Sequence, residues 1–161
     1  MKKLLIILLF LGLTNVYAES GKYSISAVCD YNKSEIDTNN KTIISIYFDC
    51  ISTVIKSDYD LFKVVENSFV KVVATIQKSS KVMDLQSFNT SVSSKNSDNK
   101  IFSENVRNAG DFKKGGSGTS KIVVGTGKCA GISGSCEYTV NYFPTNKTTT
   151  IQNCSFKNNT K

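Results

Sequence analysis

The sequence predicts an α+β fold: an antiparallel β-sheet that carries one amphipathic helix and ends in a disulfide-bridged meander. Three observations support this fold class. Two N-terminal segments alternate apolar and polar residues, a stripe of apolar residues with helical spacing follows, and short apolar runs in the C-terminal third are separated by turn residues. The alternative is an all-β sandwich. A length of 161 residues corresponds to one domain.

The first eighteen residues have the pattern of a secretory signal peptide. Two lysines precede the apolar block 4–13, and the small residues Val16 and Ala18 occupy the −3 and −1 positions of a cleavage site. The block is shorter than the roughly 20 residues that span a bilayer. We therefore expect 1–18 to be removed and 19–161 to form a single exported domain, periplasmic or extracellular, with no transmembrane segment after cleavage.

The segments 23–29 and 44–50 alternate as half-buried strands do, with Cys29 and Cys50 on the apolar faces. If the polar segment between them is a loop, a plain hairpin places Cys29 opposite about Ile44. The two sulfurs would then be some 20 Å apart, which is beyond disulfide reach. A Cys29–Cys50 bond therefore requires that these strands do not form a plain hairpin, and the connector leaves that open.

The hydrophobic period changes over residues 58–78, which predicts an amphipathic helix packed on the sheet. Ser57 and Asp58 are suitable N-cap residues. The valines lower helix propensity, so a strand near 70–76 is the alternative. The predicted buried stripe consists of Leu61, Phe62, Val65, Phe69, Val72, Val73 and Ile76.

A long polar loop is expected at about 86–120, where serine, asparagine, lysine and glycine dominate and apolar residues are few. Such a composition buries too little apolar surface to offset the entropy of ordering the chain. A loop of this length inside a compact domain is usually flexible or functional.

All five cysteines lie in 19–161, and export would place them in an oxidising compartment where disulfides form. The first-choice pair is Cys129–Cys136, at the neck of a hairpin formed by 121–129 and 136–143. This register would put oppositely charged and Thr–Thr pairs across the strands and aromatic rings over glycines. Cys154 is the rival partner of Cys136, and the second pair is Cys29–Cys50. An odd cysteine stays free or forms an intermolecular bond.

Three short patterns resemble functional motifs. Ser68 and Lys71 have the S-x-x-K spacing of acyl-transferring serine enzymes, residues 115–121 resemble a phosphate-binding loop, and Asp30 begins a partial calcium-loop pattern. Each departs from its full motif, and the S-x-x-K spacing is expected by chance in a sequence with this many serines and lysines. We predict no catalytic, cofactor-binding or metal-binding residue.

The absence of histidine from the sequence excludes Ser-His-Asp and Cys-His catalysis. The cleaved chain has 18 basic side chains (20 minus the two leader lysines) against 13 acidic ones, a net charge of +5. Only Arg107 among the basic residues is an arginine, which argues against nucleic-acid binding. We expect a non-enzymatic binding protein whose partner is a protein or an anionic surface polymer.

Two other functions are the alternatives. One is an exported hydrolase that uses carboxylates such as Asp58, Asp60 or Glu137. The other is a secreted effector or toxin that engages its target through the polar segment 86–120.

Overall fold

The computed structural model describes residues 19–60, 62, 67–78, 83–93, 96–111 and 114–159, and only the backbone of 78 and 83–89. The predicted signal peptide, together with Leu61 and Val65 of the predicted helical stripe, lies outside these ranges.

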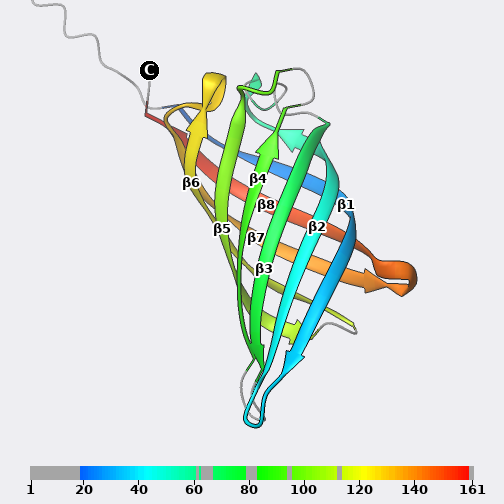
Figure 1. The fold of residues 1–161 in the computed structure, drawn as a ribbon. Coiled ribbons are helices and arrows are strands. Elements are labelled where there is room, and N and C mark those ends of the chain that lie inside the picture. The colour runs from blue at the N-terminus through cyan, green and yellow to red at the C-terminus, as the bar shows by residue number, and fades with distance from the viewer. Residues whose placement is uncertain are drawn as a thin grey trace, which may run out of the picture.

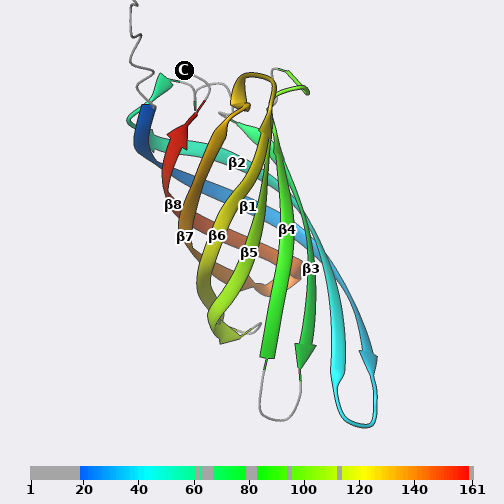
Figure 2. The ribbon, with the colours of Figure 1, turned by 90° about the vertical axis from the view of Figure 1, so that its left-hand side faces the viewer.

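Eight antiparallel strands form a closed barrel in which each strand pairs with its neighbours in the chain and β1 pairs with β8 (Figures 1 and 2). The strands are β1 (Glu19–Asp37), β2 (Thr42–Ser57), β3 (Ser68–Lys78), β4 (Met83–Val92), β5 (Lys100–Asp111), β6 (Gly115–Thr126), β7 (Ile132–Phe143) and β8 (Lys147–Asn158). The described residues contain no α-helix, only short 3-10 turns such as η2 (Gly127–Cys129) and η3 (Pro144–Asn146). The predicted α+β fold and the sandwich alternative are both wrong. In this part of the chain, no helix has the length and apolar character needed to cross a membrane.

From Ser68 onward the segment predicted as a helix is β3, and the described residues before it lie in the β2–β3 connection. Val70, Ala74 and Ile76 face the barrel interior and are buried, whereas Phe69 and Val73 face outward and are about half exposed. β-Branched side chains suit the pleated surface of a sheet better than a helix. Phe69 and Val73 are apolar at outward positions, which are polar in a strand with one buried face. The presence of apolar residues on both faces produced the helical pattern.

The segment predicted as a long polar loop contains most of β4, all of β5 and the first half of β6. The inward positions of these strands carry small or polar residues, which lowers the hydrophobicity of the segment. They include Ser103, Asn105, Gly116, Gly118 and Ser120. Because each strand in a closed barrel has two hydrogen-bonded neighbours, backbone pairing orders the segment without a continuous apolar face.

Strands β1 and β2 form a plain hairpin that runs through the polar segment. The turn lies at 38–41, where the Thr38 hydroxyl donates to the Lys41 carbonyl at 2.6 Å and accepts from the Lys41 N–H. Asp37 pairs with Thr42, so Cys29 lies directly opposite Cys50. The two form a disulfide. The expectation that this bond excludes a plain hairpin is wrong, because the polar residues continue the strand and are not a loop.

Cys136 is bonded to Cys154 and Cys129 is a buried free thiol, so the predicted Cys129–Cys136 bridge is wrong. Cys136 lies opposite Ser120 on β6 and opposite Cys154 on β8. The turn between β6 and β7 is centred on η2, where Gly127 has a φ of 57° that suits glycine. This places the turn earlier in the chain than predicted and shifts the whole hairpin register.

A cluster of buried side chains closes the end of the barrel where both termini of the described chain lie. We call it the plug. It consists of Tyr23, Phe62, Ile101, Ile122, Cys129, Ile132, Cys136, Cys154 and Phe156. The centre of the plug is Phe62, from the β2–β3 connection, whose ring stacks on Tyr23 at 3.8 Å and meets Phe156 edge-on. The hairpin turns β1–β2 and β7–β8 lie at the other end.

The cysteine chemistry predicts a specific labelling pattern. Burial raises the pKa of the Cys129 thiol to about 11, above its ordinary value of about 8.5. Since the thiolate is the reactive form, iodoacetamide at pH 8 should leave the folded protein unmodified and label Cys129 in denaturant. Because folding favours the protonated thiol, its contribution to stability should be complete below about pH 8.5 and lost as the pH rises through about 11.

Non-reducing peptide mapping after labelling should recover Cys29 joined to Cys50 and Cys136 joined to Cys154. A peptide that joins Cys129 to Cys136 would contradict the β6–β7 register described above.

Candidate ligand-binding site in the barrel lumen

The barrel interior contains a cavity of about 90 Å³ next to the plug, on the side of the hairpin turns. Its lining comes from β1, β2, β3, β5, β7 and β8. The lining residues are Ala27, Cys29, Phe48, Cys50, Val70, Val72, Ala74, Asn105, Arg107, Tyr138, Val140, Tyr142, Thr148, Thr150 and Gln152.

The lining is divided into an apolar wall and a polar wall. Strands β1–β3 contribute only apolar side chains and the Cys29–Cys50 disulfide to the cavity. Strands β5, β7 and β8 contribute every polar group, with Val140 as their single apolar residue. A chamber with this division suits a ligand that has an apolar part and a polar part.

The polar wall includes Arg107, the single arginine of the sequence and the only charged residue among the described residues that line the cavity. Its Nη2 donates a hydrogen bond to the Tyr142 hydroxyl at 3.0 Å, and its guanidinium lies 5.8 Å from the centre of the Tyr142 ring. Arginine suits this position because its planar group combines several donors with stacking on aromatic rings.

Two inward glycines of β6 create the space that these large side chains occupy. A Cβ atom on Gly116 would lie 2.3 Å from Nη1 of Arg107, and one on Gly118 would lie 2.6 Å from the ring and hydroxyl of Tyr138. Tyr138 reaches across Gly118 and donates to the Val106 carbonyl at 3.3 Å. The glycine-rich stretch that resembled a phosphate-binding loop is therefore a strand that makes room for the polar wall.

Both tyrosines of the polar wall remain protonated donors at neutral pH. Burial raises the pKa of Tyr138 and of Tyr142, and the nearby charge of Arg107 offsets part of each rise. Beside Tyr142, in the same cross-strand row, lies Thr148 on β8. The Thr148 side chain is 1 % exposed, and its hydroxyl has no hydrogen-bond partner among the described residues.

A line of aromatic contacts joins the two walls. The ring of Tyr142 meets Tyr31 edge-on at 5.8 Å, and Tyr31 lies 5.7 Å from Phe48. Arg107, Tyr142, Tyr31 and Phe48 thus form a connected series from β5 through β7 and β1 to β2. This series fixes the Tyr142 ring, and with it the position of the Arg107 group, relative to the apolar wall.

The structure separates the residues of the three motif-like patterns. Ser68 faces the interior and is buried, whereas Lys71 faces outward on the same strand, so the S-x-x-K pair does not meet. Asp30, Asn32 and Ser34 lie along β1 with exposed side chains and do not form a loop. Among the described residues, no three histidine, cysteine, aspartate or glutamate side chains are grouped so as to hold a metal ion.

The carboxylates named for a hydrolase lie outside the lumen. Asp58 follows β2 and accepts a hydrogen bond from the Lys22 N–H at 3.2 Å, and Asp60 lies in the same connection. Glu137 faces outward on β7. Asp58 and Glu137 border one outer hollow, but β8 lies between β1, whose Lys22 N–H binds Asp58, and β7, which carries Glu137. The backbones of β1 and β7 are therefore about 10 Å apart.

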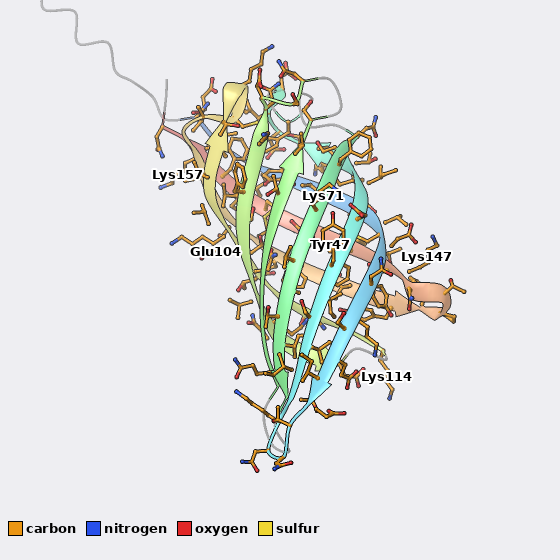
Figure 3. All side chains as sticks on the ribbon, viewed as in Figure 1. Tyr47, Lys71, Glu104, Lys114, Lys147 and Lys157 are labelled. Atoms are coloured by element: carbon orange, nitrogen blue, oxygen red, sulfur yellow. A yellow bond between two sulfur atoms is a disulfide. The ribbon has the colours of Figure 1, made fainter. Side chains whose placement is uncertain are left out.

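Charged side chains project from the outside of the barrel, as Figure 3 shows for Glu104, Lys147 and Lys157. On the outer face of β2 and β3, Lys71 forms an ion pair with Asp49 at 3.0 Å and a hydrogen bond with Tyr47 at 2.7 Å. These contacts lower the pKa of Asp49 and raise that of Lys71. Both side chains are well exposed, so the pair contributes little to stability.

Sequence reasoning missed every residue of the polar wall. Two signals were available: a single arginine in a chain that otherwise uses lysine, and two glycines at alternate positions of one strand. No protein-family model matches this sequence, and no curated protein shows significant sequence similarity to it.

Proposed function

We propose that this protein is a small exported binding protein, without enzymatic activity, that holds a small and partly apolar ligand in its lumen. The observation that carries the proposal is the division of one partly open lumen cavity into an apolar and a polar wall. An eight-stranded barrel is wide enough for its side chains and one small ligand. The cavity of about 90 Å³ is smaller than the roughly 150 Å³ cavity known to take up benzene, so the enclosed part of the ligand is slender.

Export is supported by the two disulfides and by the predicted signal peptide. Disulfides persist in the periplasm and outside the cell and are rare in reducing compartments. A periplasmic or extracellular location would expose the protein to small molecules that pass the cell surface.

A second candidate role is contact with another protein through the outside of the barrel. Val28, Ile51 and Phe69 lie opposite one another across β1, β2 and β3, and each is more than half exposed. Exposed apolar residues that form a contiguous row often mark interaction surfaces. The lysines elsewhere on the outside favour a weaker, salt-sensitive attraction to anionic polymers. No comparable feature of the described residues favours the hydrolase alternative.

The lumen proposal is tested with 1-octanol, a neutral and slender probe whose binding is measured by calorimetry, and two matched variants. Val72 lines the cavity, whereas Val73 faces outward on the same strand. Val72→Phe should fill the cavity and weaken probe binding at least tenfold, and Val73→Phe should bind as the unchanged protein does. Melting temperatures show whether both variants fold. Absence of probe binding to the unchanged protein, or equal binding by both variants, would contradict the proposal.

A further inference from the structure

Within the polar wall, three side chains form a compact group that differs from the rest of the lumen. Arg107 donates to the Tyr142 hydroxyl, and Thr148 lies opposite Tyr142 in the β7–β8 register. All three line the cavity. We call them the Arg107 group. The group brings a fixed positive charge, a half-buried phenol and a buried threonine hydroxyl to one side of the chamber.

We propose that the Arg107 group binds the anionic head of a slender amphiphile, such as a medium-chain carboxylate, whose apolar chain lies against β1–β3. This inference rests on the lumen function proposed above and adds the charge and the shape of the ligand. It requires no covalent step, because the head group is held by hydrogen bonds and charge alone.

The first argument is electrostatic. A guanidinium presents five N–H donors in a planar fork, a geometry that matches a carboxylate. None of the described residues that line the cavity is an aspartate or a glutamate, so a cationic head group would meet a positive charge and no carboxylate of the lining. Inside a barrel, such an interaction is screened by salt much less than it would be on the surface.

The second argument is the buried threonine. The Thr148 hydroxyl has no hydrogen-bond partner among the described residues although the side chain is 1 % exposed. A buried polar atom without a partner is costly. Rotation of the Thr148 side chain toward the lumen would expose its hydroxyl, and a ligand oxygen held beside Tyr142 would then supply the missing bond. The Thr148 hydroxyl would be a second donor to the ligand, on the same side of the cavity as Arg107.

The third argument concerns shape. The apolar wall consists of Val70, Val72, Ala74 and Phe48 together with the Cys29–Cys50 disulfide, which borders the group because Cys29 pairs with Thr148. None of these side chains offers a hydrogen bond of ordinary strength. An alkyl chain fits a narrow cavity of this lining, whereas a sugar or a peptide would leave its polar groups without partners.

The test compares octanoate, octylammonium and the neutral probe 1-octanol by calorimetry at pH 7. We expect octanoate to bind most tightly and octylammonium least. Arg107→Met should weaken octanoate binding by about ten- to hundredfold, as expected for a lost hydrogen bond to a charged group. Binding of octanol should change little.

Lys71→Met is the matched control, because it removes one positive charge from the outer face. It should leave octanoate binding unchanged, whereas an equal loss in both variants would mean non-specific attraction and would overturn the proposal. Equal binding of octanoate and octanol to the unchanged protein, or tighter binding of octylammonium, would also overturn it even if Arg107→Met does not fold. Either result would leave the lumen function intact as long as the neutral probe binds, and failure of the probe would contradict that function itself.

Discussion

Replacing Val70 with aspartate should unfold the barrel, whereas the same change at the neighbouring Phe69 should leave it folded. Val70 is 8 % exposed and packs beside the Cys29–Cys50 disulfide in the interior, while Phe69 is 55 % exposed on the outer face. Burying an unpaired carboxylate costs about 4 kcal/mol or more. That is a large share of the roughly 5–15 kcal/mol that stabilises a domain.

At Phe69 the new carboxylate remains in water, so we expect a cost of about 1 kcal/mol, mainly from lower strand propensity and lost cross-strand contact. Urea unfolding followed by circular dichroism measures both variants, under conditions that keep the disulfides intact. The reverse outcome, with Phe69→Asp unfolded and Val70→Asp stable, would support the helical stripe that the sequence suggested, because that stripe includes Phe69 and omits Val70.

This pair of residues also shows why the sequence misled. A strand with one buried face is recognised by strict alternation, but β3 carries apolar residues on both faces. Phe69 and Val73 both face outward and are four residues apart. Together with the inward Ile76 they have the spacing of one face of a helix. Local pattern could not distinguish the two structures, since the deciding factor is barrel closure, a set of pairings between distant segments.

The polar half of the barrel was unpredictable for a related reason. Strand β5 and the first half of β6 carry Ser103, Asn105, Gly116 and Gly118 inward, so hydrophobicity gave no signal for a strand there, whereas the second half of β6 lies in the predicted hairpin strand 121–129. The role of these small residues depends on the closed barrel, because they leave room in the lumen for the side chains of the polar wall. Alternation did predict strands where one face is apolar, at 23–29 and 44–50, and both lie within β1 and β2.

The cysteine pairs illustrate how one turn decides a long-range contact. The residues midway between Cys29 and Cys50 are Asn39 and Asn40, since (29 + 50)/2 is 39.5, and they lie in the β1–β2 turn. In the same way, (136 + 154)/2 is 145, and Thr145 lies in the turn between β7 and β8. Asparagine and proline-containing turns were visible in the sequence. The proline-containing turn places Cys154 near Cys136 in the predicted meander, and a tight turn at 38–41 between long strands places Cys29 opposite Cys50.

Loss of both disulfides should abolish folding, because together they contribute about as much free energy as a small domain has in total. The bonds close loops of 21 and 18 residues, and chain entropy assigns about 3 kcal/mol to each loop of this size. The sum of about 6 kcal/mol falls within the range of a whole domain. The double variants Cys29→Ser/Cys50→Ser and Cys136→Ser/Cys154→Ser should each lower the urea midpoint, and the quadruple variant should be unfolded in water.

These variants are best made in a Cys129→Ala background, since the buried free thiol in the plug would otherwise exchange with the remaining bridge during unfolding.

The different locations of the two disulfides allow a second test, which distinguishes a role in ligand binding from a role in stability. Cys29–Cys50 lines the cavity and Cys136–Cys154 belongs to the plug. At equal stability, adjusted with a mild stabilising osmolyte, loss of the first bond should weaken binding of 1-octanol more than loss of the second. Equal weakening would mean that the Cys29–Cys50 bond acts on the whole fold and has no specific part in the apolar wall.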